Sequence, residues 1–203
     1  MPHTSKKRVN TTPTKIRIIG GEWRSRKLEV LSRPGLRPTG DRMRETLFNW
    51  LAPYIIQSRC LDAFAGTGSL GLEALSRGAS RVEFIETNTL CANNLRENLK
   101  RLEPFPNSAV AKVGETNFLA WVRQPNDEPF DIVFVDPPFA DELWQQTLEL
   151  LQQSNRLRDE ALVYVETPKG ITVTPPDNWA ILKQKVSGQV CATLYKTNHV
   201  IRR

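Results

Sequence analysis

The segment FVDPPFA, residues 134–140, combines residue types that suit chemistry on an amine. Asp136 ends a hydrophobic run and is followed by Pro137, Pro138 and the aromatic Phe139. Because proline fixes its own φ and restricts the residue before it, the segment forms a stiff corner. This corner presents two acceptors at set positions, the Asp136 carboxylate and a main-chain carbonyl of the proline pair. Two acceptors are the natural complement of the exocyclic NH₂ group of a nucleobase.

Such an amine is a poor nucleophile because its lone pair is delocalised into the ring. Acceptors bonded to both N–H groups favour a pyramidal nitrogen whose lone pair points at an incoming methyl group, so positioning and electrostatics would supply most of the rate enhancement. Asp136 is also a candidate to receive the departing proton. Phe139 is placed to stack on the base, a contact worth about 1–3 kcal/mol in single-stranded recognition. We interpret the segment as a site for an amine-bearing base.

A glycine-rich turn within LDAFAGTGSLGLEA, residues 61–74, is the second chemical feature. Gly66, Gly68 and Gly71 form a GxGxxG pattern that follows one predicted strand and opens one predicted helix, the context in which this pattern binds a ligand. A dinucleotide and S-adenosylmethionine (SAM) both fit the turn. Asp62 favours SAM, because a carboxylate four residues before the turn can stabilise the amino-acid end of that cofactor, directly or through water.

Two further acids end neighbouring strands. Glu86 is placed to accept hydrogen bonds from ribose hydroxyls, although NAD-binding proteins share this feature. Glu115 ends the third strand, where SAM enzymes often place an acid near the adenine amine, and an exposed strand-end glutamate explains it equally well. The predicted cofactor-binding residues are Asp62, Phe64, Ala65, Gly66, Thr67, Gly68, Glu86 and Glu115.

The elements that position these residues alternate between strand and helix from residue 59 onward. Strands are predicted at 59–66, 81–86, 109–115, 130–136 and 161–168, and helices at 69–78, 89–103, 117–124 and 141–154. Alternation of this kind favours an α/β fold with a parallel sheet. Residues 179–201 predict two more strands around Gly188, which add an antiparallel hairpin. The carboxyl ends of the parallel strands open onto one crevice, so Asp136 is expected near the glycine turn.

The first fifth of the chain differs in character. Residues 1–14 are predicted to be a disordered basic tail, and residues 15–40 a β-hairpin around GGEWRSR with a linker. A helix over 41–54 begins the main domain, which runs to residue 203. Asp41 is its expected N-cap, and one apolar face is expected to carry Met43, Leu47, Trp50, Leu51 and Tyr54.

The positive charge is concentrated at this end. The chain has a formal net charge of +6, but residues 1–44 hold 12 Lys or Arg and 3 Asp or Glu, a local charge of +9, against −3 for the remainder. A basic arm on a mildly acidic body is typical of a nucleic-acid-binding protein. A solubilising tail is the alternative interpretation of this feature.

Composition argues against a metal-binding, a membrane-spanning or a secreted protein. The three cysteines are far apart and the two histidines, His3 and His199, lie near opposite ends, so no metal site is expected. No apolar run approaches the roughly 18 residues of a membrane span, and the N-terminus lacks the apolar segment of a secretory signal. We expect a cytoplasmic protein without membrane contact.

Four motifs in the same order resemble the RsmD-type 16S ribosomal RNA guanine-N2 methyltransferases of bacteria. They are RIIGGEWRSRKL (17–28), RPTGDRMRETLFNWL (37–51), LDAFAGTGSLGLEALSRGA (61–79) and FDIVFVDPPF (130–139), and GQV…LY (188–195) also fits. Ser25 stands where this family usually has glycine. The resemblance implies a Rossmann-like SAM-dependent methyltransferase fold with a mostly parallel seven-stranded sheet, an antiparallel C-terminal hairpin and a small N-terminal β-hairpin extension.

The resemblance also implies a substrate and its contacts. The enzyme would methylate N2 of one guanine in 16S rRNA of the assembled or nearly assembled small ribosomal subunit, with SAM as methyl donor and no metal. Asp136, Pro137, Pro138 and Phe139 would form the catalytic site. The expected RNA-contacting residues are Arg24, Arg26, Arg37, Thr39, Asp41, Arg42 and Arg44. We expect a monomer, because RNA would occupy the basic face.

Three other functions compete with this one. A DNA adenine-N6 methyltransferase also uses D-P-P-aromatic, but it commonly carries an added target-recognition domain for which this chain has little length. A NAD-dependent oxidoreductase fits the glycine turn and leaves the D-P-P-F corner unexplained. A non-catalytic RNA-binding protein fits the basic arm but neither of the two motifs.

Overall fold

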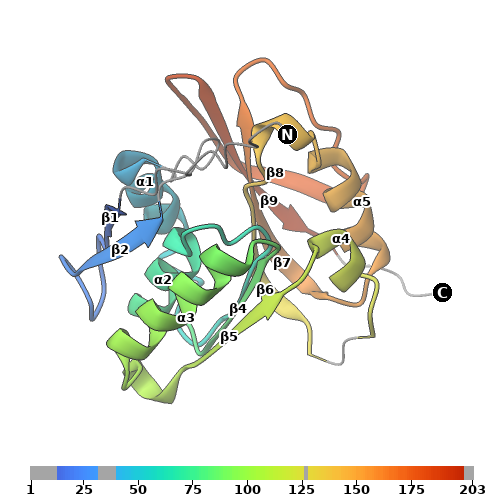
Figure 1. Ribbon diagram of the computed structural model, residues 1–203. Coiled ribbons are helices and arrows are strands. Elements are labelled where there is room, and N and C mark those ends of the chain that lie inside the picture. The colour runs from blue at the N-terminus through green and yellow to red at the C-terminus, as the bar shows by residue number, and fades with distance from the viewer. Residues whose placement is uncertain (1–12, 32–39, 126–127, 199–203) are drawn as a thin grey trace, which may run out of the picture.

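The computed structural model describes residues 13–31, 40–125 and 128–198 of the 203-residue chain. Its centre is a seven-stranded sheet, which Figure 1 shows among the helices. The strand order is β5-β4-β3-β6-β7-β9-β8. The strands are β3 (Arg59–Asp62), β4 (Arg81–Glu86), β5 (Val110–Glu115), β6 (Phe130–Val135), β7 (Leu157–Pro168), β8 (Trp179–Ser187) and β9 (Val190–Thr197). The first five strands of this order pair in parallel, and β9 pairs antiparallel with β7 and β8. The predicted mostly parallel sheet with an antiparallel C-terminal hairpin is therefore confirmed.

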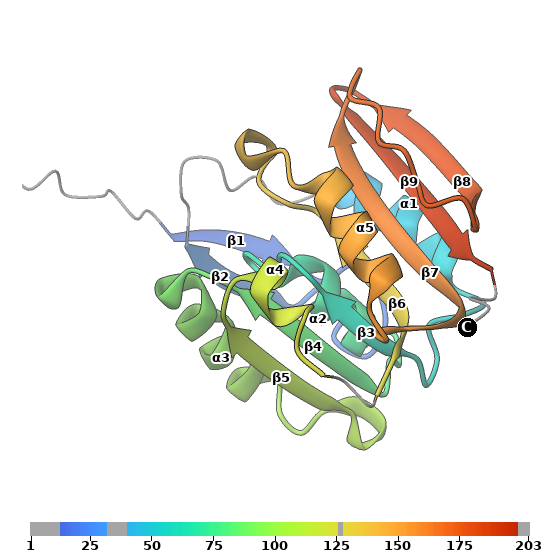
Figure 2. The same cartoon turned by 90° about the vertical axis from the view of Figure 1, so that its right-hand side faces the viewer.

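Helices cover both faces of this sheet. The helices are α1 (Asp41–Leu51), α2 (Ser69–Ser76), α3 (Thr89–Leu102), α4 (Phe118–Trp121) and α5 (Trp144–Gln153), with single 3₁₀ turns at Pro106–Ser108 and Phe139–Asp141. One core cluster joins α1, α2 and α3 to the sheet, and a second cluster joins α4 and α5 to the opposite face. Figure 2 shows α5 in front of the sheet and α1 behind it.

The central strands are apolar because helices cover both faces of the sheet. Strands buried on both faces read as continuous hydrophobic runs, as FDIVFV does in β6. Phe134 belongs to the cluster under α1, whereas Val133 and Val135 belong to the cluster under α5, because successive side chains point to opposite faces. The strand therefore positions Asp136, the residue that follows it, on the same side as Phe134.

The N-terminal hairpin forms its own two-stranded antiparallel sheet from β1 (Pro13–Arg17) and β2 (Lys27–Leu31). Leu28 and Val30 are buried, and the Glu29 carbonyl accepts a hydrogen bond from the amide of Asn98 in α3 at 3.0 Å. The hairpin is thus packed on the main domain. Residues 1–12 of the expected tail lie outside the described residues, and β1 begins at Pro13.

The backbone conformation of Ser25 and the packing of Trp23 define the turn of the hairpin. Ser25 has a φ of 69° and donates its backbone N–H to the Ile18 carbonyl at 2.9 Å. Glycine adopts this left-handed conformation without strain, which fits the glycine that the family resemblance leads one to expect at this position. Trp23 in the same turn is buried and meets the ring of Phe105 edge-on, with centroids 5.9 Å apart. Its role is therefore packing of the hairpin.

Two expectations for the first helix were wrong. Gly40, and not Asp41, occupies the N-cap position, and no side chain caps the helix. Asp41 is instead the first helical residue, where an acid is favoured by the helix dipole, and its carboxylate pairs with arginines described below. The helix ends at Leu51, so Tyr54 lies beyond it and is exposed, while Met43, Leu47 and Leu51 are buried as expected.

Candidate functional site

The carboxyl ends of neighbouring parallel strands bring the predicted motifs together at one edge of the sheet. Asp62 at the end of β3 is the register partner of Phe134 in β6, and the Ala63 N–H donates to the Phe134 carbonyl at 3.0 Å. Asp136 lies two residues beyond that contact. The glycine turn and the D-P-P-F corner are therefore direct neighbours.

The glycines of the turn have different structural tasks. Gly68 has a φ of 75° and precedes α2, and a Cβ at this position would lie 2.5 Å from Leu95 Cδ1. Gly71 lies inside α2, where a Cβ would lie 2.2 Å from Phe84 Cε1. The first therefore permits the turn, and the second permits close packing of the helix on β4.

Asp62 is buried beneath this turn, and its Oδ2 accepts a hydrogen bond from the Gly71 N–H at 3.0 Å. Burial raises the pKa of the Asp62 carboxyl to about 7; the Gly71 hydrogen bond opposes the shift and the charge of Glu86 adds to it. The carboxyl therefore changes its charge near neutral pH.

Glu86 fastens the turn to the next strand. Its Oε2 accepts a hydrogen bond from the Gly66 N–H at 2.7 Å, and its Oε1 accepts one from the Asn88 N–H at 2.6 Å. Sequence reasoning placed Glu86 at the cofactor but did not predict this contact with the turn. Binding of ribose hydroxyls by the same carboxylate stays a prediction.

Glu115 lies in register with Glu86, at the end of β5. Its carboxylate accepts a hydrogen bond from the Thr89 hydroxyl at 2.6 Å and pairs with Arg96 at 3.1 Å. The Thr89 hydrogen bond, followed by that of Arg96, lowers the pKa of the Glu115 carboxyl. A contact with adenine remains a prediction for this exposed, ionised group.

The D-P-P-F corner presents its ring at the surface. Pro137 is buried, whereas Phe139 is 42% exposed in the 3₁₀ turn that follows the strand. The Phe139 ring lies 5.9 Å from that of the buried Trp144, at an interplanar angle of 52°. One side of the ring is thus supported by the protein, which suits a side chain that stacks on a base.

Sequence reasoning missed two buried residues beside Asp136. Tyr164 and Glu166 lie on β7, the strand that pairs with β6, and the tyrosine hydroxyl donates to Glu166 Oε2 at 2.8 Å. Burial raises the pKa of the Tyr164 hydroxyl well above its ordinary value, and the charges of Glu166 and Asp136 raise it further. The available signal was the acid in VYVET, which ends an apolar run as Asp136 does.

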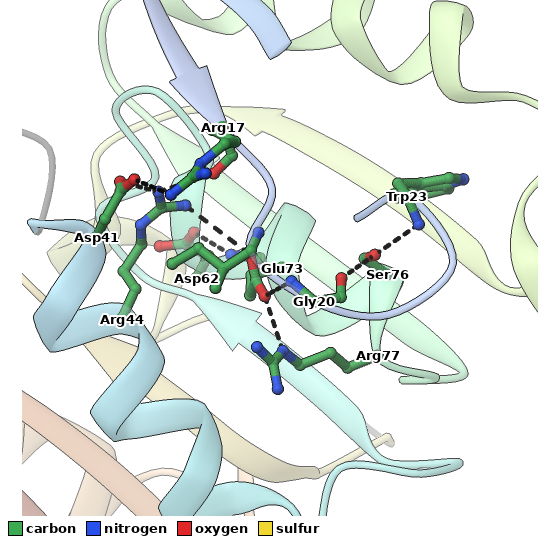
Figure 3. Close-up of polar contacts among 11 residues, drawn as sticks. Arg17, Gly20, Trp23, Asp41, Arg44, Asp62, Glu73, Ser76 and Arg77 are labelled. Atoms are coloured by element: carbon green, nitrogen blue, oxygen red, sulfur yellow. Dashed lines mark hydrogen bonds and ion pairs between the residues drawn. The ribbon is translucent and has the colours of Figure 1, made fainter. Parts of the chain in front are cut away.

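A further missed residue, Glu73 of α2, fastens the N-terminal hairpin to the helix of the glycine turn (Figure 3). Its side chain is fully buried and accepts hydrogen bonds from the N–H groups of Ile19 and Gly20, both at 2.8 Å. Arg77 donates to the same carboxylate through Nε at 2.7 Å. Backbone donors of the hairpin turn are thus satisfied by a charged acceptor, an arrangement that gives strong hydrogen bonds.

Ser76 completes this fastening one turn later in α2. Its hydroxyl donates to the Gly20 carbonyl at 2.6 Å and accepts from the Trp23 N–H at 3.0 Å. The Ser76 carbonyl accepts from the Glu22 N–H at 2.8 Å. Gly21 has a φ of 76°, and a Cβ there would lie 1.8 Å from that carbonyl oxygen, so the close approach requires glycine.

Arg44 was expected on the substrate side of the crevice, but its side chain is only 1% exposed. Its guanidinium donates to Asp41 Oδ1 at 2.7 Å and to the Arg17 carbonyl at 2.9 Å, and lies 3.9 Å from Glu73 (Figure 3). Asp41 also accepts from Arg17 at 3.3 Å. Arg44 therefore joins α1, β1 and α2 in the interior and is shielded from an external substrate.

The remaining predicted RNA-contacting residues are exposed where they are described. Arg24 and Arg26 lie in the hairpin turn and Arg42 in the first turn of α1. Arg37 and Thr39 lie outside the described residues. In the part of the chain that the structure describes, no group of three or more His, Cys, Asp or Glu side chains could hold a metal ion, and no helix could cross a membrane.

Together, the sheet order, the glycine turn and the D-P-P-F corner define the class as a Rossmann-like methyltransferase fold. Residues 16–196 match the family model described as conserved hypothetical protein 95, and the chain belongs to this family of RsmD-type methyltransferases. A relative from Haemophilus influenzae, ribosomal RNA small subunit methyltransferase D, is 50% identical over 94% of this chain and 99% of its own length.

Solved structures agree with this fold. The Escherichia coli protein yhhF superposes with a TM-score of 0.82 at 45% identity, covering 91% of this chain and 99% of that one. An RNA methyltransferase from Salinibacter ruber, solved with S-adenosyl-L-homocysteine, superposes with a TM-score of 0.61 at 14% identity and covers 81% and 96% of the two chains. At that identity the likeness concerns the fold alone.

Proposed function

We propose that this protein transfers a methyl group from SAM to the exocyclic N2 amine of a guanine in 16S rRNA of the small ribosomal subunit. The observation that carries the proposal is the D-P-P-F corner on β6, set directly beside the glycine turn on β3. One motif suits an amine-bearing base and the other a nucleotide-like cofactor. The relative named a small-subunit RNA methyltransferase supports the substrate class.

The residues of the turn fit SAM by their chemistry. Asp62 would bind the amino-acid end and Glu86 the ribose hydroxyls, while Phe64, Ala65, Gly66, Thr67 and Gly68 would line the cofactor and Glu115 would stand near the adenine. SAM supplies an electrophilic methyl group. The Salinibacter ruber protein of like fold was solved with S-adenosyl-L-homocysteine, the demethylated product of that cofactor, so the fold is compatible with such a molecule.

The Asp136 carboxylate and a main-chain carbonyl of the proline pair would hold the amine, with its lone pair directed at the methyl group. Such preorganised acceptors are worth most in a site that excludes water. The proton that leaves the nitrogen would pass to Asp136 or to solvent. Phe139 would stack on the base and fix its plane.

The basic N-terminal hairpin would contact rRNA phosphates through Arg24 and Arg26, with Arg37, Thr39, Asp41 and Arg42 near the entrance to the crevice. Arg44 is left out of this set because it is buried. We propose that the monomer acts on assembled or nearly assembled subunits, with residues 15–40 as an RNA-contacting extension of the catalytic domain 41–203.

The test is methyl transfer from labelled SAM to four substrates: unmethylated small subunits, their proteins, naked 16S RNA and duplex DNA. Product nucleosides are identified by mass. We expect N2-methylguanosine from subunits. N6-methyladenine in DNA would assign the alternative function. No transfer to any substrate would contradict the proposed methyl transfer and reopen the question of which ligand the glycine turn holds.

The Asp136→Ala variant tests the role of the corner in the same assay. We expect kcat to fall by about 10²- to 10³-fold or more, as on removal of a group that stabilises a transition state, with the Kd for SAM nearly unchanged. Asp141→Ala, which removes an exposed acid on the same segment, is the matched control. Equal loss of SAM binding and methyl transfer in Asp136→Ala would contradict the assigned role.

A further inference from the structure

The end of β7 holds a buried carboxylate that the reaction described above does not use. Glu166 is 5% exposed, and its Oε2 accepts a hydrogen bond from the Tyr164 hydroxyl at 2.8 Å. Removing a carboxylate from water is costly, so a buried acid at the edge of a candidate site is a sign of function.

The sheet places Glu166 beside Asp136. Strands β6 and β7 pair in register up to Val135 and Val165. The next residues along the chain are Asp136, which follows β6, and Glu166, which lies in β7. Phe134 and Tyr164 are register partners in the same core cluster, and side chains two residues apart share a face. Neighbouring strands lie about 4.8 Å apart. The side chains of Asp136 and Glu166 therefore project from adjacent positions on the same side of the sheet.

A guanine presents two adjacent donors on its Watson–Crick edge, N1–H and the N2 amine. An adenine presents its amine beside N1, which is an acceptor. An ionised carboxylate only accepts hydrogen bonds. Two carboxylates side by side therefore match the edge of guanine, and they oppose the N1 lone pair of adenine.

We propose that Glu166 selects guanine by accepting a hydrogen bond from its N1–H while Asp136 holds the N2 amine, an inference that rests on the proposed function. Tyr164 acts as a positioning residue, since its hydroxyl fixes the Glu166 carboxylate through Oε2. The pair of acids thereby reads two neighbouring donors of the base, one of which is the amine that is methylated.

A single indole links the parts of this base site. Trp144 Nε1 donates to the Glu166 carbonyl at 2.7 Å, and the Trp144 ring lies 5.9 Å from that of Phe139. Trp144 thus contacts both Phe139, which would stack on the face of the base, and Glu166, which would contact its edge. This arrangement keeps a specificity contact in fixed geometry.

The first experiment compares substrates with the unaltered enzyme. Small subunits are reconstituted with guanine, 2-aminopurine or 7-deazaguanine at the mapped target nucleotide. 2-Aminopurine keeps the N2 amine but has an acceptor at N1, and 7-deazaguanine keeps N1–H. We expect kcat/KM to fall about 10- to 100-fold for 2-aminopurine, the usual discrimination of a paired hydrogen-bond contact, and to change less than about threefold for 7-deazaguanine.

The second experiment exchanges the specificity. The amide of Glu166→Gln can donate to N1 of 2-aminopurine, so the guanine to 2-aminopurine ratio of kcat/KM should fall at least about tenfold. Tyr164→Phe should lower the ratio less. Glu160→Gln, the same change at an exposed position near the other end of β7, should leave it unchanged.

Two outcomes would overturn the inference. One is equal methylation of guanine and 2-aminopurine by the unaltered enzyme, a result that needs no stable variant. The other is an equal loss on both substrates in a folded Glu166→Gln protein. Absence of N2-methylguanosine from guanine-containing subunits is a separate result, which would refute the proposed function and this inference with it.

Discussion

At the scale of single residues, the candidate site contains three carboxylates that differ in burial and in their hydrogen-bond partners. Asp62 is buried under the glycine turn, Glu86 holds that turn through two backbone N–H groups, and Glu115 is ionised at the rim. All three end neighbouring strands. Burial raises the pKa of the Asp62 carboxyl to about 7, whereas hydrogen bonds from Thr89 and Arg96 lower the pKa of Glu115. The charge of the Asp62 carboxyl therefore changes with pH near neutrality.

This property predicts a pH dependence of cofactor binding. If the charged form of Asp62 binds the amino-acid end of SAM, affinity should weaken as the pH falls through about 7, by up to about tenfold per pH unit well below it. Isothermal titration calorimetry across this pH range measures the dependence. Asp62→Asn should bind SAM more weakly and flatten the profile; an unchanged profile would show that another group is responsible.

The same shift has a consequence for stability. A carboxyl with a folded-state pKa of about 7, against 3.8 for the ordinary group, binds more protons in the folded protein between those values. Its contribution to the free energy of unfolding therefore declines as the pH rises through this window. Bound SAM would offset this cost by supplying a positive charge near the carboxylate.

At the scale of elements, α2 serves two parts of the molecule at once. Its N-terminal end forms the glycine turn, and Glu73 and Ser76 nearer its C-terminal end hold the N-terminal hairpin. The basic hairpin is therefore attached to the same helix as the glycine turn, so the proposed RNA-contacting and cofactor-binding parts are held together by one element.

Replacing Glu73 tests this attachment. Glu73→Gln substitutes an NH₂ group for one of two oxygens that each face a backbone N–H, so the free energy of unfolding should fall by about 2–4 kcal/mol. Urea unfolding measures the change. Glu97→Gln, at an exposed position on α3, should cost less than about 0.5 kcal/mol. Similar losses in both variants would argue against the fastening role.

At the scale of the whole molecule, the basic N-terminal segment is distinct in charge but not separate in packing. All of the net positive charge lies in residues 1–44, yet the hairpin buries Trp23, Leu28 and Val30 against the domain. Deletion of residues 1–36 would therefore remove part of the core together with the charge. Single exposed arginines give a cleaner test of RNA binding.

The double variant Arg24→Gln, Arg26→Gln should bind subunit RNA more weakly. The slope of log K against log salt should become shallower by about 0.7–0.9 for each phosphate that the variant no longer neutralises. Filter binding between about 50 and 200 mM salt, the range in which such charges are resolved, measures the slope. Arg123→Gln, at an exposed position next to α4, should leave it unchanged. An unaltered slope in the double variant would remove the hairpin turn from the RNA-binding surface.

The sequence by itself determined the architecture and the two chemical motifs. Apolar runs that alternate with amphipathic helices, and a glycine turn at a strand-to-helix junction, are local signals, and they placed Asp62, Glu86 and Asp136 at strand ends. These signals depend on neighbouring residues along the chain, which is why they can be read without coordinates.

Only the tertiary structure decided how distant residues meet. Arg44 was expected at the substrate, but packing of α1 on α2 places it in the interior. Glu73 gave no distinctive local pattern, because one of its backbone partners, Ile19, lies 54 residues away along the chain. Glu166 ends an apolar run as Asp136 does, but its place beside Asp136 depends on the order of the strands in the sheet. Burial and partner choice arise from long-range packing, so the fastening of the hairpin and the pair of carboxylates at the proposed base site emerge only in the folded chain.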